Sequence, residues 1–509
     1  MTTSDLLLDA ARLEGPPADA KTADLPPAAP PQRLRSLRLP VWAPAVIPAL
    51  LMLIIGRIGI RRPALGWDEN ATWLVSRRTV AQIVDQAGHF DGVISPYYLF
   101  MHFWTAVFGD SEFWLRAPSL ICVAAGVGLV GELGRRLLGP GVGLLGGLML
   151  DLVPQLSRYA QDARAYGFAF LFGTLATLLL YRALQRPTWA RWCAYAIVVM
   201  LLGFAHILAL LILIGHAYAV ISRSWPADRA TIRRWFLATA TAIGPVLPLI
   251  YLGLTQRGDQ LDWIEDMSLR QVAAAPGDMF GSTAAGLLLI GLALTVRRPR
   301  KRVLRELAVL AVAPPTALIA VSFVTDSLWV PRYVLVVLPA ICLCAAAAMR
   351  AVPMRAAMAL LLLTGVAVPA QSAVRGPTSH MGPDFRKIAQ AITRNQQPGD
   401  VIVYGATGTW SLRAGIDYQL RGGPKPLDVL LLTPAAQVGQ LNAVQCPDPV
   451  ACLGTPRRIW FFRYERPGKP LPDAGPLTDA GLLKDTLTRD YHQAGAWQAT
   501  KADLILFER

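Results

Sequence analysis

The sequence predicts a polytopic α-helical membrane protein with a small soluble domain at its C-terminal end. Hydrophobic residues make up 54% of the 509 residues and charged residues only 16%, whereas a soluble domain carries about 25% charged residues. The mean hydropathy of +0.40 includes polar ends, so the middle of the chain is more apolar still. This composition excludes a disordered, collagen-like or coiled-coil protein and a disulfide scaffold.

About eleven apolar runs follow one another and predict transmembrane helices. They lie at 41–60, 117–134, 141–157, 165–182, 192–204, 206–222, 235–254, 279–296, 306–323, 333–349 and 356–372. The apolar stretch 192–222 is too long for one helix. We divide it at Gly203–His206, where a polar side chain suits a turn at the membrane surface.

The net charge of +15 is explained by basic cytoplasmic loops, so we expect no nucleic-acid partner. With the N-terminus inside, the predicted cytoplasmic loops hold 22 Lys and Arg in about 86 residues, and the outer loops hold 10 in about 100. Such an excess is typical of cytoplasmic loops, and RRPRKRVLR at 297–305 is its strongest example. The protein is therefore expected in the plasma membrane, with a cytoplasmic N-terminus and an extracytoplasmic C-terminal domain.

Three parts are expected along the chain. Residues 1–40 are rich in Ala and Pro and predict a disordered cytoplasmic tail. Residues 41–372 form the transmembrane domain, whose first outer loop is 61–116. Residues 373–509 predict a soluble α/β or α+β domain, with a helix after residue 383 and strands at 400–404, 459–464 and 504–509. In that domain Cys446 and Cys452 predict a disulfide, since the outside is oxidising.

Two segments of the first outer loop carry unusual polar residues. GWDENATWLV contains the adjacent carboxylates Asp68 and Glu69, whose desolvation and mutual repulsion favour a functional site over an ordinary solvated acid pair. HFDGVISPYYLFMHFWTAVFGDSEFWLRAPSLI contains Asp91. Its SPYYLFMHFWTAVFG portion predicts an amphipathic helix at the membrane interface.

Together with SRYAQDARAYGF at 157–168, these segments resemble the GT-C superfamily of integral-membrane glycosyltransferases. The resembled branch is family-39-like and contains protein mannosyltransferases and the aminoarabinose transferase of lipid A. The resemblance covers about 41–340 well and 380–405 loosely, and implies a GT-C fold. High usage of Ala, Arg, Gly and Pro indicates a GC-rich bacterium, such as an actinobacterium.

The resemblance implies an inverting transferase that uses a polyprenyl-phosphate sugar donor. An acceptor hydroxyl would attack the anomeric carbon while polyprenyl phosphate leaves. Asp68 is then the catalytic base, since a carboxylate can accept the hydroxyl proton. Glu69 is a helper carboxylate or a structural one, and Asp91 is a second acid on the acceptor side.

The resemblance also implies cationic side chains for the donor phosphate, because a leaving phosphate needs fixed positive charge. In SRYAQDARAYGF these are Arg158 and Arg164, with Tyr159, Asp162 and Tyr166 in support. Alternatively, Arg158 and Asp162 form only an i, i+4 salt bridge. VTDSLWVPRYVLVVLP adds Arg332 and Tyr333, although a lone arginine there could simply snorkel to the surface. Trp263, in the outer loop before 279, is a candidate to stack on the acceptor sugar.

A metal site has weak support in the sequence. No H-x-x-H, HExxH or CxxC spacing occurs. His89 with Asp91 and Glu69 could make a loose site for a divalent ion, as in some relatives, but ordinary polar histidines are favoured. No cofactor is assigned, and a divalent ion is left open.

The resemblance implies transfer of a sugar, with mannose as the commonest in the resembled branch, to an acceptor at the outer face of the plasma membrane. Arabinofuranose is the alternative donor sugar, and a glycan, lipoglycan or protein hydroxyl is the acceptor. A transporter or flippase would place its charges near mid-membrane in paired halves, whereas here they gather at one face. A non-catalytic scaffold would give the Asp68–Glu69 pair no arginine partners on that face.

Overall fold

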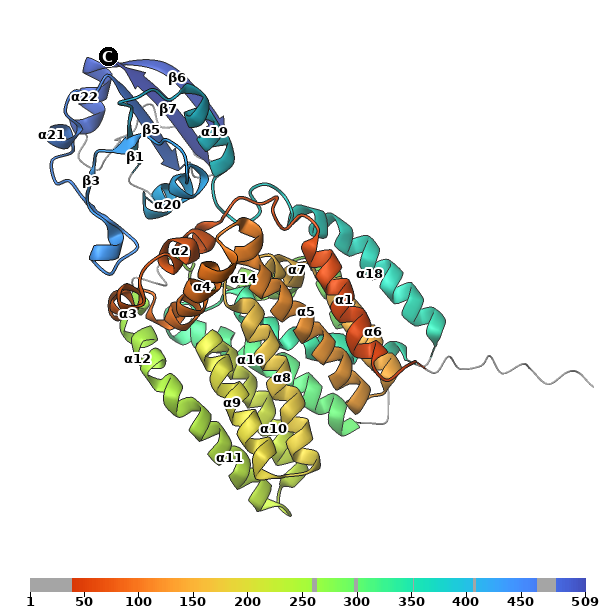
Figure 1. Cartoon of the computed structure of the whole chain (residues 1–509). Coiled ribbons are helices and arrows are strands. Elements are labelled where there is room, and N and C mark those ends of the chain that lie inside the picture. Colours follow the sequence, from red (N-terminus) through yellow and green to blue (C-terminus); the bar gives the residue numbers. More distant parts are fainter. Residues whose placement is uncertain (1–38, 259–262, 297–300, 351, 406–408, 465–481) are drawn as a thin grey trace, which may run out of the picture. The chain divides into compact units, whose positions relative to one another are not determined.

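The computed structural model describes residues 39–258, 263–296, 301–350, 352–405, 409–464 and 482–509 (Figure 1). The predicted tail therefore lies outside the described residues, apart from positions 39 and 40. Residues 297–300 of the basic 297–305 loop also lie outside them.

Helices fill the described chain up to Ala373. In order these are α1 (Ala43–Arg57), α2 (Trp67–Ser76), α3 (Val80–His89), η1 (Gly92–Ile94), α4 (Ser95–Phe108), α5 (Glu112–Leu137), α6 (Pro140–Asp151), α7 (Pro154–Ala160), α8 (Tyr166–Gln185), α9 (Trp189–Ala205), η2 (Ile207–Leu211), α10 (Ile212–Ser224), α11 (Arg229–Ile243), η3 (Gly244–Val246), α12 (Leu247–Thr255), α14 (Leu269–Phe280), α15 (Thr283–Leu294), α16 (Lys301–Val324), η4 (Pro331–Val337), α17 (Leu338–Met349) and α18 (Pro353–Ala373).

Seven helical segments within the described residues are long and apolar enough to cross a membrane, and the bent pair α14–α15 would make an eighth. The helices α1, α6 and α9 are also apolar but shorter. Each of the eleven predicted runs falls on one of these elements, but the count of eleven spans is not confirmed. The protein is a multi-pass membrane protein.

Two of the predicted apolar stretches are interrupted in the structure. The 192–222 stretch breaks where the sequence suggested, because α9 ends at Ala205 and His206 is the extended residue before η2. The predicted run 279–296, by contrast, is not one straight helix. Its first residues belong to α14, and α15 starts after an 88° bend at Gly281, whose φ is +70°.

Close contact between α1 and α5 depends on small residues. A Cβ added at Gly131 of α5 would lie 1.7 Å from the carbonyl oxygen of Pro44, and one at Gly128 would lie 2.9 Å from that of Ala45. Backbones approach this closely only where side chains are missing. These glycines therefore hold α1, which leads into the first outer loop, directly against α5.

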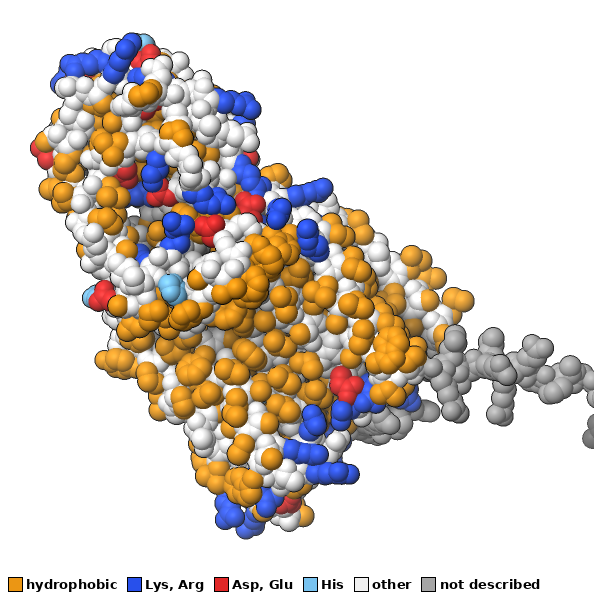
Figure 2. Space-filling view, in the orientation of Figure 1, with side chains coloured by type: hydrophobic (Ala, Val, Ile, Leu, Met, Phe, Trp, Pro, Cys, Tyr) orange, Lys and Arg blue, Asp and Glu red, His pale blue; other side chains and the backbone are white. Residues whose placement is uncertain are grey.

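The first outer loop is itself mostly helical. It contains α2, α3 and the predicted interfacial helix, which is α4. The side chains of Phe103 and Val107 on α4 are 60% and 74% exposed, as expected for a helix lying at a membrane surface. In Figure 2 hydrophobic side chains cover much of the helical part of the molecule, and Lys and Arg gather at the lower ends of α9–α11.

The C-terminal part forms a five-stranded sheet with helices beside it. Its elements are α19 (Phe385–Asn395), β1 (Val401–Tyr404), α20 (Thr409–Gln419), β2 (Leu427–Asp428), β3 (Leu431–Thr433), η5 (Ala435–Gln437), β4 (Val444–Gln445), α21 (Pro449–Leu453), β5 (Arg458–Tyr464), α22 (Leu482–Asp490), β6 (His492–Ala499) and β7 (Ala502–Glu508). The strand order is β2-β1-β5-β7-β6, with β1 parallel to β2 and β5 and the other pairs antiparallel. A separate antiparallel pair joins β3 to β4.

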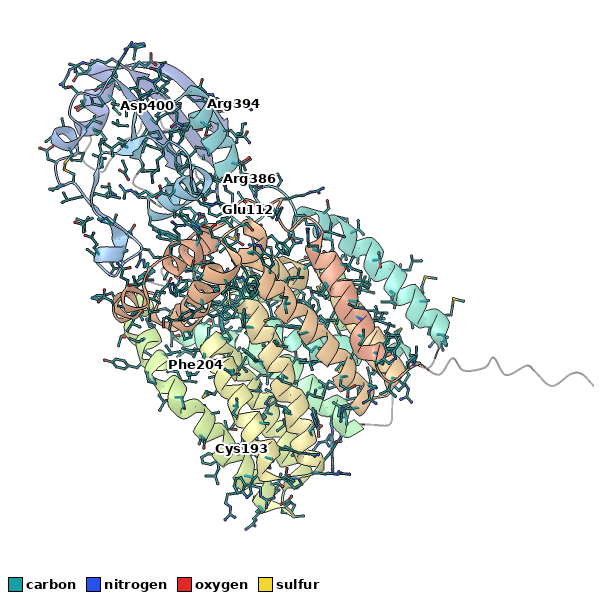
Figure 3. All side chains as sticks on the ribbon, viewed as in Figure 1. Glu112, Cys193, Phe204, Arg386, Arg394 and Asp400 are labelled. Atoms are coloured by element: carbon teal, nitrogen blue, oxygen red, sulfur yellow. A yellow bond between two sulfur atoms is a disulfide. The ribbon has the colours of Figure 1, made fainter. Side chains whose placement is uncertain are left out.

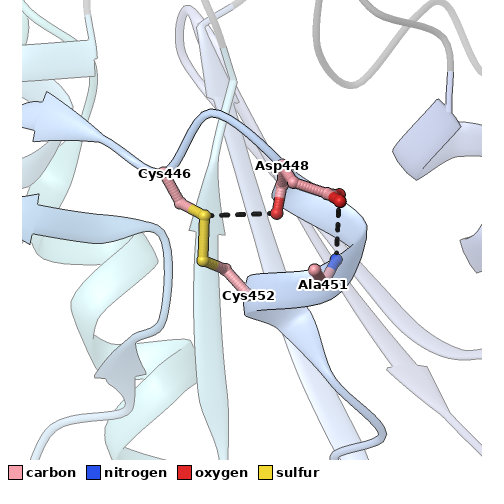
Figure 4. The surroundings of a disulfide bond; sticks show 4 residues. All are labelled: Cys446, Asp448, Ala451 and Cys452. Atoms are coloured by element: carbon pink, nitrogen blue, oxygen red, sulfur yellow. Dashed lines mark hydrogen bonds between the residues drawn. A yellow bond between two sulfur atoms is a disulfide. The ribbon is translucent and has the colours of Figure 1, made fainter.

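Buried side chains cover both faces of this sheet. Phe385 and Ile388 of α19 pack with Trp460 and Phe462 on one face, and Leu483 of α22 packs with Phe461 on the other. Asp400, which precedes β1, accepts a hydrogen bond of 2.7 Å from the Trp460 indole. The predicted disulfide between Cys446 and Cys452 is present, and Asp448 between them caps α21 through the Ala451 amide (Figure 4).

Polar contacts join the sheet part to the outer loop. Arg386 of α19 pairs with Glu112 at the start of α5, and both are labelled in Figure 3. The Tyr418 hydroxyl donates to the Asp110 carbonyl, and the Asn70 amide donates to the Ser411 hydroxyl at 3.1 Å. The C-terminal part therefore contributes side chains close to α2.

Candidate active site

Asp68 lies in the first turn of α2. Gly66 ends the preceding segment with an extended backbone, and its N–H donates to the Glu69 carboxylate at 3.1 Å. A Cβ at Gly66 would lie 1.9 Å from the His380 carbonyl oxygen, so only glycine fits there. An acidic residue in a first turn is also favoured by the partial positive charge of the helix N-terminus.

Glu69 points the other way and is completely buried. Its two oxygens each accept a 2.7 Å hydrogen bond from the Arg116 guanidinium, and one of them also accepts from the Ala163 amide. Burial opposes ionisation, but the Arg116 charge holds the pKa of Glu69 well below its usual range. Because the same guanidinium donates to the carbonyls of Ile60 and Pro63, this pair fixes the chain where it enters α2.

His380, from the segment before α19, completes this buried cluster. Its Nδ1 lies 2.7 Å from the Glu69 carboxylate. Burial lowers the pKa of His380 to about 3, so the ring is neutral and donates its Nδ1 proton. The chain beyond the last transmembrane helix thus helps to hold α2.

Two arginines face the Asp68 carboxylate from different elements. Arg164, from the turn before α8, places Nη2 3.8 Å from Asp68, and Arg332, from η4, places Nη2 3.7 Å from it. The Asp68 side chain is 42% exposed, while those of Arg164 and Arg332 are 9% and 13% exposed. Both separations exceed hydrogen-bond length, so the guanidinium groups keep N–H donors for a phosphate oxygen.

These arginines also control the protonation of Asp68. Burial of the carboxyl tends to raise its pKa, but the charges of Arg164 and Arg332, with that of Arg158, lower the pKa below the usual range. Asp68 is therefore a carboxylate at neutral pH and can accept a proton.

Asp91 is connected to the same place through Tyr98. The Tyr98 hydroxyl donates to Asp91 at 2.7 Å and accepts a hydrogen bond from Arg164 at 3.1 Å. Asp91 is only 9% exposed and has a positive φ of 58°. Burial raises the pKa of Asp91. In this geometry Asp91 orients Arg164 and does not contact Asp68 directly.

Arg158 and Asp162 form the predicted ion pair, with 3.6 Å between Nη1 and Oδ1. The pair is not on one helix, because α7 ends at Ala160. Burial raises the pKa of Asp162 to about 6, despite the opposing charge of Arg158.

Aromatic side chains surround Arg332. The Arg332 Nε donates to the Tyr166 hydroxyl at 2.8 Å, and its guanidinium lies 5.0 Å from the Trp263 ring and 5.6 Å from the Tyr333 ring. Tyr159 contacts Tyr166, with 5.1 Å between ring centroids. Rings with cations over their faces form a surface on which a sugar or a lipid phosphate could rest.

A metal ion does not fit these residues. Within the described ranges, the one group of three ligating side chains is Glu69, Asp162 and His380, whose ligand atoms lie within 4.8 Å of one another. Arg116 already occupies both Glu69 oxygens, so a cation would have to displace a buried guanidinium. His89, the other histidine considered from the sequence, is exposed and bonds to the Asp85 carbonyl.

Three residues of this cluster are not marked by any motif in the sequence. Arg116 was seen only as part of the segment leading into the second predicted span, and His380 stands alone in a Gly- and Ser-rich stretch. His206 was used to divide two helices, yet its ring lies 4.7 Å from that of Tyr333. A single arginine inside an otherwise apolar run was the available signal for Arg116.

Comparison with known families finds one match. Residues 96–251 match the family model of dolichyl-phosphate-mannose-protein mannosyltransferases. This segment runs from α4 into α12 and is less than half of the chain. No curated protein matches the chain in a sequence search.

Comparison with solved structures finds the same fold elsewhere. ArnT from Cupriavidus metallidurans in the apo state superposes with a TM-score of 0.56 and 14% identity, covering 91% of this chain and 97% of that one. ArnT from the same organism bound to undecaprenyl phosphate gives 0.54 and 13%, with the same coverage. These matches confirm the resemblance seen in the sequence and the fold class that it implied.

Proposed function

We propose that this chain, a membrane glycosyltransferase of the GT-C superfamily, transfers a sugar from a polyprenyl phosphate to an acceptor hydroxyl with inversion. The observation that carries the proposal is the Asp68 carboxylate, which is 42% exposed and is faced by the Arg164 and Arg332 guanidinium groups, whose side chains are 9% and 13% exposed. One anion for the acceptor proton and two cations for a phosphate are the groups that this reaction needs.

In the proposed reaction Asp68 is the general base. It accepts the proton of the acceptor hydroxyl while that oxygen attacks the anomeric carbon, and the bond to the phosphate oxygen breaks. Arg164 and Arg332 stabilise the negative charge that develops on the leaving phosphate. Tyr166 and Tyr333 orient Arg332 by their contacts with it.

The other site residues are assigned supporting roles in this proposal. Glu69 holds α2 in place, because both its oxygens are already engaged. Asp91 positions Arg164, and Arg158 adds positive charge beside Asp162. Trp263, whose ring lies over Arg332, borders the place where a sugar would lie.

The donor is proposed to be a polyprenyl-phosphate sugar, most simply mannose. The matched family model names dolichyl-phosphate mannose, and one matched ArnT structure holds undecaprenyl phosphate. Transfer would occur at the outer face of the plasma membrane, where α2 and the C-terminal part would both lie. The basic loops at the opposite helix ends support that orientation.

Replacement of the base tests the proposal. Asp68→Asn preserves the shape of the side chain, but an amide cannot take the acceptor proton, so transfer from polyprenyl-phosphate mannose should fall about 10²–10⁴-fold. The measurement is product formation by purified full-length protein in lipid. Asp85→Asn, at an exposed acid of α3, is the matched control and should transfer at the wild-type rate.

A donor-binding assay distinguishes the role of Arg332 in binding the phosphate from the role of Asp68 as the base. Arg332→Ala should weaken binding of polyprenyl-phosphate mannose, whereas Asp68→Asn should still bind it. Wild-type transfer by folded Asp68→Asn protein would show that Asp68 is not the base. The same pair of assays with polyprenyl-phosphate arabinofuranose distinguishes the two donor sugars.

A further inference from the structure

A cavity lies at the end of α2 opposite to Asp68. Its volume is about 430 Å³, and it is bordered by the last turn of α2 and by α20 with the loop that follows it. Four cationic side chains line it: Arg77, Arg78, Arg421 and Lys425. We call this hollow the α2–α20 cavity.

The cations of the α2–α20 cavity outnumber the carboxylates beside them. Lys425 pairs with Asp417. Arg77 and Arg421 share Asp110, at 3.2 and 3.6 Å. Four positive charges thus face two negative ones, which leaves a surplus of two positive charges around an open hollow.

Arg78 carries the charge that is least compensated. Its residue exposure is only 4%, and its Nη1 and Nη2 donate to the neutral oxygens of Gln86 and Gln440. In the part of the chain that the structure describes, Arg78 has no carboxylate partner, and its Nε has no hydrogen-bond acceptor. A buried guanidinium without a counter-charge is costly, and an anion in the cavity would reduce that cost.

We propose that the α2–α20 cavity binds a carboxylate or phosphate group of the acceptor, which is therefore an acidic glycan. The inference rests on the proposed transferase function and names its acceptor class. The uncompensated charge of Arg78 favours either anion, and Arg77 and Lys425 add charge at the rim, where their side chains are more than half exposed.

The distance between Asp68 and the α2–α20 cavity sets a minimum length for that acceptor. Asp68 lies in its first turn and Ser76 is its last residue. Eight residues of helix rise about 12 Å, so the acidic group would lie well away from the hydroxyl that reacts at Asp68. The acceptor is then an oligosaccharide that extends along α2, and not a single sugar.

Binding of small acidic sugars to the full-length protein in lipid nanodiscs tests this site without any donor or transfer. The probes are glucuronic acid and glucose 6-phosphate, with glucose as a comparison, and saturation-transfer NMR titrations give their Kd. Inorganic phosphate, which has no carbon-bound protons, is measured by its competition against the glucose 6-phosphate signal. We expect the two acidic sugars to bind, glucose to show no saturation, and inorganic phosphate to bind more weakly than glucose 6-phosphate.

Matched substitutions locate the bound probe. Arg78→Gln should raise the Kd about tenfold or more, because the uncompensated positive charge that attracts the anion is lost, and Arg78→Lys should keep part of the affinity. Lys425→Gln should raise it roughly threefold, whereas Lys387→Gln, an exposed lysine on α19, should leave it unchanged. If Arg78→Gln does not fold, the exposed rim double variant Arg77→Gln/Lys425→Gln provides the same test.

Several results would overturn the proposal. Equal binding of glucose and glucuronic acid would show that no anion is recognised, and equal binding of inorganic phosphate and glucose 6-phosphate would show that no sugar is recognised. Competition by undecaprenyl phosphate would assign the cavity to the donor. Because Asp68→Asn should bind the probes normally, failure here leaves the transfer assay, and the function it tests, unaffected.

Discussion

At the scale of single residues, two adjacent carboxyl groups have different environments because successive positions on a helix point in different directions. Asp68 is half exposed between two arginines, and Glu69 is fully buried against a third. Exposure leaves Asp68 accessible to an acceptor hydroxyl. Glu69 has a structural role, because both of its oxygens already accept hydrogen bonds from Arg116. The sequence alone could not separate these roles.

The link from Asp91 through Tyr98 to Arg164 predicts a loss of activity when one hydroxyl is removed. Tyr98→Phe should lower kcat about tenfold, because a hydrogen bond to a charged group is worth about 1.5–3 kcal/mol, with a smaller change in KM for the acceptor. The measurement is steady-state transfer kinetics.

Tyr97→Phe is the control for this experiment. The Tyr97 side chain is buried like that of Tyr98, but its hydroxyl has no hydrogen-bond partner among the described residues. Its removal should leave kcat unchanged. Equal kinetic effects of Tyr97→Phe and Tyr98→Phe would argue that packing, and not the orientation of Arg164, is responsible.

The raised pKa of Asp162 predicts how transfer depends on pH. As the pH falls through about 6, Asp162 takes up a proton and its ion pair with Arg158 is lost, so the Arg158 guanidinium is no longer held in place. Transfer should therefore decline from pH 7 to pH 5. The lowered pKa of Asp68 places loss of the base at more acidic pH.

Asp162→Asn isolates this effect on the pH profile. The variant should transfer more slowly at pH 7 but should lose the decline between pH 7 and pH 5, as measured with full-length protein in lipid. An unchanged midpoint near pH 6 in Asp162→Asn would assign the titration to another group.

At the scale of helices and strands, sequence patterns predicted the elements whose formation depends on residues near one another in the chain. Apolar runs located the helices, and the aromatic segment at 95–109 predicted α4 (Ser95–Phe108). The strand β6 was missed because HQAGAWQA at an edge of the sheet is mostly exposed and has no apolar run. The bend at Gly281 was missed although Ser282 caps α15, because the apolar residues on both sides of it favoured a single span.

In the site too, the sequence predicted a contact between residues close in the chain but not contacts between distant ones. Arg158 and Asp162 are four residues apart, and the sequence paired them. Arg116 and His380 reach Glu69 from 47 and 311 residues away. Only the packing of α5 and of the segment before α19 against α2 brings these side chains together.

Packing of α1 on α5 predicts that one methyl group will destabilise the protein. Gly131→Ala would place a Cβ 1.7 Å from the Pro44 carbonyl, so α1 must shift, at about 1–3 kcal/mol or more for overpacking. We expect a lower Tm for full-length protein in detergent.

Gly141→Ala is the matched control in α6, since a Cβ there would have no neighbour within 4 Å. Its Tm should equal or slightly exceed that of the wild type, because alanine favours a helix. If both variants melt at the wild-type temperature, the close approach of α1 and α5 does not contribute to stability.

At the scale of the whole molecule, the proposed chemistry requires α2 and the C-terminal part to face the same side of the membrane. Polar contacts between them support this arrangement, among them Arg386–Glu112 and Asn70–Ser411. The basic ends of α9–α11 would then lie in the cytoplasm.

Thiol labelling of intact cells tests this orientation. Both variants are made in a Cys193→Ser background, because Cys193 is an exposed free thiol. Gln397→Cys then places a thiol at an exposed position of the C-terminal part, and Thr188→Cys places one at an exposed position before α9. A membrane-impermeant maleimide should label Gln397→Cys in whole cells but Thr188→Cys only after lysis, because positive charge keeps the loop before α9 inside. Labelling of Thr188→Cys in intact cells, with Gln397→Cys protected, would place Asp68 on the cytoplasmic side and require a cytoplasmic donor instead.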